Sequence, residues 1–92
     1  MSTLSAKEIA THLVSRPDWK IEGGLLVRTF AFETFGNAIS FVDKVAALAE
    51  EAGHHPDIDI RYNKVRLALV SHDAGGLTTK DFALAAGADG LA

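Results

Sequence analysis

The sequence predicts a single α+β domain over residues 1–92, with a four-stranded antiparallel sheet, three helices packed on one face and the order α-β-β-α-β-β-α. Three observations support this fold class. Two pairs of strand-like segments are each joined by a short turn, a long segment with helical periodicity lies between the pairs, and helix start signals stand near both ends of the chain. The length of 92 residues, 48% of them hydrophobic, suits one packed domain.

The first helix and the first hairpin have clear local signals. Ser5 and Glu8 form a predicted capping box at the start of the helix, and Pro17 ends it. Residues 19–22 and 25–32 are then predicted as two strands, because a Gly-Gly pair between them favours a tight hairpin turn.

Residues 34–52 are predicted to form the long helix, which Gly53 ends. One face carries apolar residues at helical spacing: Phe35, Ala38, Ile39, Val42, Val45, Ala46 and Ala49. Phe41 and Leu48 fall outside this stripe, so we expect them to contact a second subunit. A chain this small that has no cysteine for disulfides also gains stability from association, which predicts a homodimer or homotetramer.

The second hairpin follows from strict alternation over residues 57–62 and 65–70, with Asn63-Lys64 as a two-residue turn. This turn would pair Ile60 with Leu67 on the core face and, extended outward, would bring His55 opposite His72.

The last helix begins at a second predicted capping box, in which Thr78 is the cap and Asp81 the acid three positions later. We interpret Asp81 as a capping residue rather than a catalytic one. Gly87 and Gly90 predict that the helix is weak beyond Ala86.

Composition excludes several functions. The net charge of −3 disfavours nucleic-acid binding, and the lack of cysteine excludes thiolate zinc sites and cysteine nucleophiles. No apolar run reaches the roughly 18 residues of a membrane span, and the first residues lack the basic start of a signal peptide. We therefore expect a cytoplasmic protein without a membrane or nucleic-acid partner.

Three histidines are predicted to lie at one end of the molecule. His54 and His55 follow the long helix, His72 follows the last strand, and Glu50 lies one helical turn before the pair. Imidazole titrates near neutrality, so such a cluster can remove one proton while it delivers another. Two other interpretations stay open: a helix C-terminal cap formed by His54 and His55, and a zinc site. Because adjacent side chains in an extended segment point to opposite faces, we expect no metal.

The chain resembles the pterin-4a-carbinolamine dehydratase family over roughly residues 5–86. The residues that carry the resemblance are Glu50, His54, His55, Pro56, Tyr62, His72 and Asp81, together with Trp19 and residues 28–32. The resemblance implies an α+β fold in which subunits join their sheets and pack helices into dimers or tetramers. It also implies dehydration of 4a-hydroxytetrahydropterin to quinonoid dihydropterin, which recycles the pterin cofactor of aromatic amino acid hydroxylation.

Carried onto this sequence, the resemblance implies that His54, His55 and His72 are catalytic. The pterin-contacting segments would then be residues 54–56, which include Pro56, and residues 71–74, which are Ser71, His72, Asp73 and Ala74. Glu50 would orient a histidine, and Trp19 would be an aromatic wall. No metal or organic cofactor is implied. Which pterin is used, and which histidine is the acid, stay open.

Two alternatives to this function stay open. One is a non-catalytic interaction module, because animal members of the family also serve as dimerisation cofactors of a homeodomain transcription factor. The other is the same chemistry on a different pterin or a molybdopterin-related compound.

Overall fold

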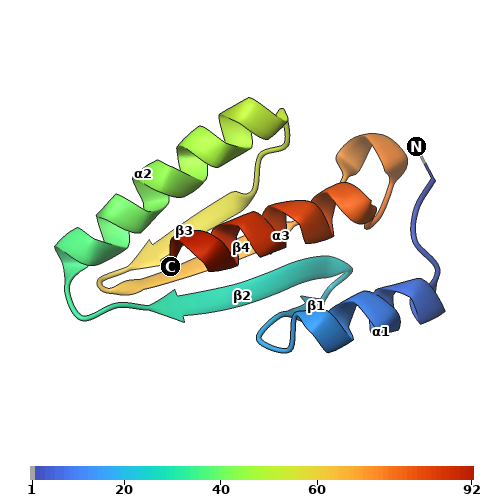
Figure 1. Cartoon of the computed structure of the whole chain (residues 1–92), viewed down its shortest axis with the longest axis horizontal. Coiled ribbons are helices and arrows are strands. Elements are labelled where there is room, and N and C mark those ends of the chain that lie inside the picture. The colour runs from blue at the N-terminus through green and yellow to red at the C-terminus, as the bar shows by residue number, and fades with distance from the viewer. Residues whose placement is uncertain (1) are drawn as a thin grey trace.

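The computed structural model describes residues 2–92 and contains the predicted α+β fold (Figure 1). The helices and strands are α1 (Ala6–Ser15), β1 (Lys20–Glu22), β2 (Leu25–Ala31), α2 (Phe35–Ala52), β3 (Asp57–Arg61), β4 (Lys64–Leu69) and α3 (Thr79–Leu91). The four strands form one antiparallel sheet in the order β1-β2-β4-β3, and the helices cover one of its faces. The predicted fold class and element order are therefore confirmed.

Both predicted capping boxes are present. In α1, Ser5 Oγ accepts a hydrogen bond from the Glu8 amide at 3.1 Å, while Glu8 Oε1 accepts one from the Ser5 amide at 2.8 Å. The amide and hydroxyl of Ser5 hold the pKa of Glu8 below its ordinary value. The same arrangement, with Thr78 and Asp81, begins α3.

The predicted register of the second hairpin is wrong by two residues. Ile60 pairs with Val65, because the turn consists of Tyr62 and Asn63 rather than Asn63 and Lys64. Tyr62 has a φ of 55°, and the Asn63 side chain donates a hydrogen bond to the Phe32 carbonyl at 2.6 Å. This hydrogen bond joins segments that are distant in the sequence, so the local alternation of residues does not predict it. A shift of two residues leaves every side chain on its predicted face.

The buried face of α2 agrees with the predicted stripe at Ala38, Val45 and Ala49 and differs from it at two aromatic residues. Phe41 is buried and packs against Phe30 and Phe32, and Leu48 packs against the edge of the same core. Phe35, by contrast, is 51% exposed. The predicted stripe assumes that the helix packs against one surface. Because α2 packs against both the sheet and α3, a wider part of its circumference is buried. The expectation that Phe41 contacts a second subunit is therefore wrong, while for the partly buried Leu48 it stays a prediction.

The last helix continues beyond Ala86 and runs through Gly87 and Gly90 to Leu91, contrary to the prediction of a weak end. Tertiary contacts explain the difference. Asp89 accepts hydrogen bonds from Trp19 Nε1 and from Arg16 and Arg28, which ties the end of α3 to the sheet. These contacts outweigh the low helix propensity of glycine.

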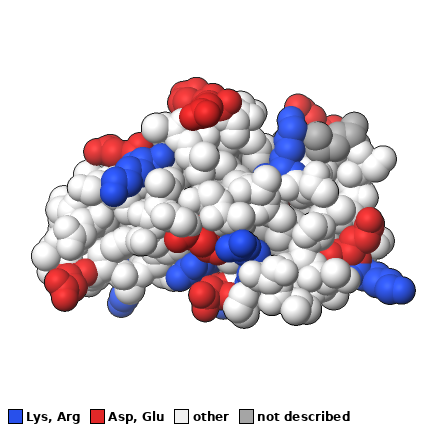
Figure 2. All heavy atoms as spheres, viewed as in Figure 1, with Lys and Arg blue, Asp and Glu red and all other residues white. Residues whose placement is uncertain are grey.

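The surface on the helical side carries no gathering of one charge. Figure 2 shows acidic and basic side chains dispersed over this face with broad uncharged areas between them. The net charge of −3 agrees with this mixed surface. Within residues 2–92, none of the helices combines the length and the apolar character needed to cross a membrane.

Candidate active site

A cavity of about 400 Å³ lies where α2 and β4 end and α3 begins. Three separate segments line it: residues 53–55 after α2, residues 70–74 after β4, and one residue of the first turn of α3. The lining residues are Gly53, His54, His55, Val70, Ser71, His72, Asp73, Ala74 and Lys80. The three predicted histidines therefore share one cavity, although 17 residues separate His55 from His72 in the sequence.

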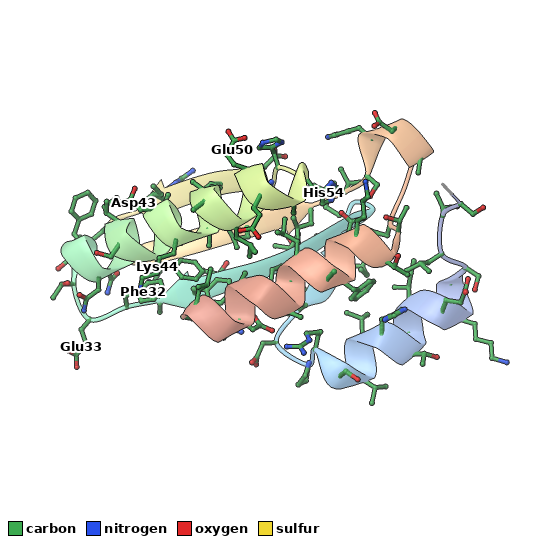
Figure 3. The ribbon with its side chains drawn as sticks, turned by 45° about the horizontal axis from the view of Figure 1, so that its top comes forward. Phe32, Glu33, Asp43, Lys44, Glu50 and His54 are labelled. Atoms are coloured by element: carbon green, nitrogen blue, oxygen red, sulfur yellow. The ribbon has the colours of Figure 1, made fainter. Side chains whose placement is uncertain are left out.

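The end of α2 determines the position of His54. Gly53 adopts the left-handed conformation, with φ 63° and ψ 31°, which a residue with a side chain adopts only with strain. The chain thereby turns back, and the His54 amide donates a hydrogen bond to the Ala49 carbonyl at 3.1 Å. The imidazole of His54, 12% exposed, lies between the end of α2 and the start of α3 (Figure 3).

His54 has a buried carboxylate as its partner. Its Nε2 lies 2.6 Å from Oδ1 of Asp81, whose side chain is fully buried. The other carboxylate oxygen, Oδ2, accepts hydrogen bonds from the Ser71 hydroxyl and the Thr78 amide, both at 2.9 Å. The predicted capping role of Asp81 is confirmed, but sequence reasoning missed its contact with His54. The signal was present, because Asp81 belongs to the residue pattern that carries the family resemblance.

His55 lies at the open rim of the cavity. Its Nε2 is 3.3 Å from Glu50 Oε2, and both side chains are well exposed, at 62% and 78%. Glu50 does not line the cavity, and Figure 3 shows it on the outer side of α2. The predicted orienting role of Glu50 thus has a geometric basis toward His55. The contact is solvent-exposed and correspondingly weak.

His72 does not continue a strand. It begins a short 3-10 helix, His72–Ala74, inside a loop that a bridge between Ser71 and Gly76 closes. His55 and His72 do not face each other across the hairpin, because the register differs and β4 ends at Leu69, but both line the same cavity, in agreement with their expected proximity. The loop nevertheless presents His72 to the cavity.

Two expected binding residues lie elsewhere. Trp19 is only 4% exposed, packs edge-on against Phe30 and donates from Nε1 to Asp89, so it is part of the core rather than a wall of this cavity. Pro56 connects His55 to β3 and does not line the cavity either.

One lining residue was missed by the sequence analysis. Lys80 belongs to the first turn of α3 and lines the cavity together with the two loop segments that carry the histidines. Its only sequence signal is its place immediately before Asp81. Its ammonium group supplies a hydrogen-bond donor at the rim.

The site offers groups for proton transfer. Three imidazoles line one cavity, and a buried carboxylate is hydrogen-bonded to one of them. Across the described residues 2–92, no three histidine, aspartate or glutamate side chains are arranged to hold a metal ion together. The absence of a functional metal stays a prediction.

Fold and site together define a class: a small α+β protein with a cavity lined by three histidines, a side chain that can transfer protons near neutral pH. Comparison with known proteins gives the family. The family model described as "Pterin 4 alpha carbinolamine dehydratase" matches residues 2–91. The chain belongs to this family, which confirms the resemblance seen in the sequence.

Curated relatives match along nearly their whole length. A Chloroflexus aurantiacus protein named "Putative pterin-4-alpha-carbinolamine dehydratase" is 65% identical over 89 residues, covering 97% of this chain and 96% of its own. A protein of the same name from Acidobacterium capsulatum is 56% identical over 91 residues, covering 99% of each chain.

Two solved structures share the fold. One, described as a transcriptional coactivator/pterin dehydratase from Brucella melitensis, superposes with a TM-score of 0.94 at 29% identity and covers 99% of each chain. The other is described as a pterin dehydratase-like protein that is a RuBisCO assembly factor in the alpha-carboxysome. It has a TM-score of 0.66 at 31% identity, covering 79% of this chain and 84% of its own.

Proposed function

We propose that this protein is a dehydratase that removes water from 4a-hydroxytetrahydropterin and gives quinonoid dihydropterin in pterin cofactor recycling. The observation that carries the proposal is the presence of His54, His55 and His72 in one cavity. Family membership adds the substrate class.

The reaction needs two proton transfers at neighbouring atoms of the pterin. The C4a–O bond breaks, and the oxygen leaves as water after it receives a proton from an acid. A base removes the proton on N5, and the electron pair of that N–H bond forms the C4a=N5 double bond. Imidazoles on separate segments, His54 after α2 and His72 after β4, can serve the two atoms at once.

The cavity also suits a molecule of this kind. Its volume of about 400 Å³ lies in the range of about 300–1,000 Å³ usual for small-molecule sites. Ser71, Asp73 and Lys80 line it with hydrogen-bonding groups, which a pterin ring can use because it carries donors and acceptors around its edge.

The second candidate, a non-catalytic interaction module, has its own supporting observation. Apolar side chains remain exposed on α2 and on the edge strand β3, namely Phe35, Ile58 and Ile60. One structural relative is described as a RuBisCO assembly factor. We favour the dehydratase, because an interaction surface on α2 and β3 has no use for a buried histidine–carboxylate pair. The exposed side chains suit self-association of this chain.

The direct test is the breakdown of freshly generated 4a-hydroxytetrahydropterin, followed with and without the purified protein. The substrate also loses water slowly by itself, so the uncatalysed rate is the baseline. The proposal predicts a rate that rises in proportion to protein concentration. A rate equal to the uncatalysed baseline would contradict the dehydratase proposal and favour the interaction module. The same assay with other 4a-hydroxypterins ranks the substrates.

A further inference from the structure

The buried carboxylate of Asp81 has a complete set of hydrogen-bond partners. At Oδ2 it accepts from the Ser71 hydroxyl and from the Thr78 amide. At Oδ1 it meets Nε2 of His54 at 2.6 Å. The Ser71 oxygen in turn lies 2.8 Å from Thr78 Oγ1.

The direction of these hydrogen bonds follows from their chemistry. The Thr78 amide can only donate, and the Ser71 hydroxyl donates to Oδ2 as well, so Oδ2 is an acceptor twice over. At Oδ1 the partner is a ring nitrogen of His54, so the hydrogen between them lies either on the carboxylate or on the imidazole. A proton shared by a carboxylate and an imidazole resides on the imidazole, the more basic of the two groups. His54 therefore carries a hydrogen on Nε2, and Oδ1 accepts it.

We propose that Asp81 is a positioning residue, that it fixes His54 as the Nε2–H tautomer, and that Nδ1 of His54 is the base that takes the N5 proton. This inference rests on the proposed function. When Nδ1 accepts the proton, the ring becomes an imidazolium whose charge faces a buried carboxylate 2.6 Å away. Such a pair stabilises the charged ring, as in the serine–histidine–aspartate arrangement.

The acid role then falls to one of the exposed histidines. His55 and His72 are both exposed at the cavity, where they exchange protons with water. Of the two we assign the acid role to His72, which can protonate the departing hydroxyl and then recover its proton from solvent. The buried position of His54, 12% exposed, suits the group that must be held in one orientation.

The substitution Asp81→Asn tests this assignment with little change in shape. The two donors, Ser71 and Thr78, require an acceptor at the position of Oδ2, so the amide oxygen of the new side chain must occupy it. The amide NH₂ then faces His54 Nε2 and needs an acceptor there. His54 is forced into the opposite tautomer, with hydrogen on Nδ1, and the base is lost. The capping hydrogen bond from Thr78 is retained.

The first readout is the tautomer of His54, measured by ¹⁵N NMR of the imidazole without substrate, with His54→Ala to assign the signals. We expect Nε2–H in the native protein and Nδ1–H in Asp81→Asn. The matched control is Glu8→Gln, the same carboxylate-to-amide change at the equivalent position of the α1 capping box. It leaves the His54 tautomer unchanged.

The second readout is turnover. We expect Asp81→Asn to lower kcat by about 10²-fold or more with a smaller change in KM, while Glu8→Gln keeps the native kcat. An Nδ1–H tautomer in the native protein, or full activity of folded Asp81→Asn, would overturn the inference. If the native protein does not turn over the pterin at all, the proposed function fails, and the tautomer measurement still decides the role of Asp81.

Discussion

One carboxylate, that of Asp81, serves the fold and the site together. It closes the capping box at the start of α3 and it holds the ring of His54. The two tasks use different oxygen atoms of the same rigid carboxylate. The start of α3 and the orientation of His54 are therefore coupled, so a change at the start of α3 also changes the position of His54 in the cavity.

The other two histidines are expected to differ from each other in kinetic effect. We predict that His72→Ala lowers kcat by about 10²-fold, the usual scale for loss of a general acid or base. His55→Ala should raise KM more than it lowers kcat, because His55 is exposed at the rim and we expect it mainly to position the pterin ring. Steady-state kinetics of the two variants give both constants. Equal kcat values for His72→Ala and the native protein would show that His72 does not transfer a proton.

For individual residues, sequence reasoning predicted which histidines lie together but not every contact that they make. Imidazoles stand out because they titrate near neutrality, and His54, His55 and His72 do share a cavity. The pairing of Asp81 with His54 joins residues 27 apart through the fold, and no local pattern reveals it. Trp19 shows the reverse case, since the family resemblance suggested a binding wall, whereas Trp19 is buried in the core and donates a hydrogen bond to Asp89.

Helix packing accounts for most of the differences between predicted and observed elements. Periodicity reports where apolar residues recur on a helix, but it does not say how many surfaces the helix meets. Because α2 meets both the sheet and α3, Phe41 belongs to the core and the partly buried Leu48 packs against it. The turn at Tyr62 and Asn63 was likewise decided by a contact with a distant segment.

The close packing of α2 and α3 depends on Gly87. A Cβ atom built there would lie 2.7 Å from Leu48 Cδ2, so Gly87→Ala must displace Leu48. In the same helix, a Cβ at Gly90 would meet nothing within 4 Å. Replacing an unhindered helical glycine with alanine stabilises a protein by roughly 0.5–1 kcal/mol.

We therefore predict that Gly90→Ala raises the free energy of unfolding and that Gly87→Ala does not, with a difference of about 1 kcal/mol between them. Urea unfolding of both variants measures this difference. Equal stabilisation by the two substitutions would mean that the contact between α2 and α3 is loose.

The whole molecule leaves apolar surface uncovered on one side. Phe35 on α2 and Ile60 on the edge strand β3 are exposed, and the outer edge of β3 has no strand neighbour within residues 2–92. An unpaired edge strand with apolar side chains favours pairing with another chain. Of the original reasons for expecting an oligomer, the position of Phe41 no longer holds, but the small size, the lack of disulfides and this exposed surface support the same prediction.

We predict a homodimer or homotetramer at micromolar concentration, measured by light scattering coupled to size exclusion. Ile60→Lys should lower the measured mass, because it places a charge on the exposed apolar surface. The control is Val14→Lys, which changes an equally apolar but separate position on α1. A native mass near 9.8 kDa would contradict the prediction.

We propose above all that this protein dehydrates a 4a-hydroxypterin in the cavity lined by three histidines. The most direct measurement compares the initial rate of 4a-hydroxytetrahydropterin loss for the native protein and for the double variant His54→Ala/His72→Ala, with folding checked by circular dichroism. We predict strong acceleration by the native protein and a rate close to the uncatalysed one for the double variant. Because the two residues act as one unit, the fold-decrease in catalysed rate for the double variant should be smaller than the product of the fold-decreases for the two single variants. Native-like acceleration by the folded double variant would contradict the assignment of this cavity as the active site.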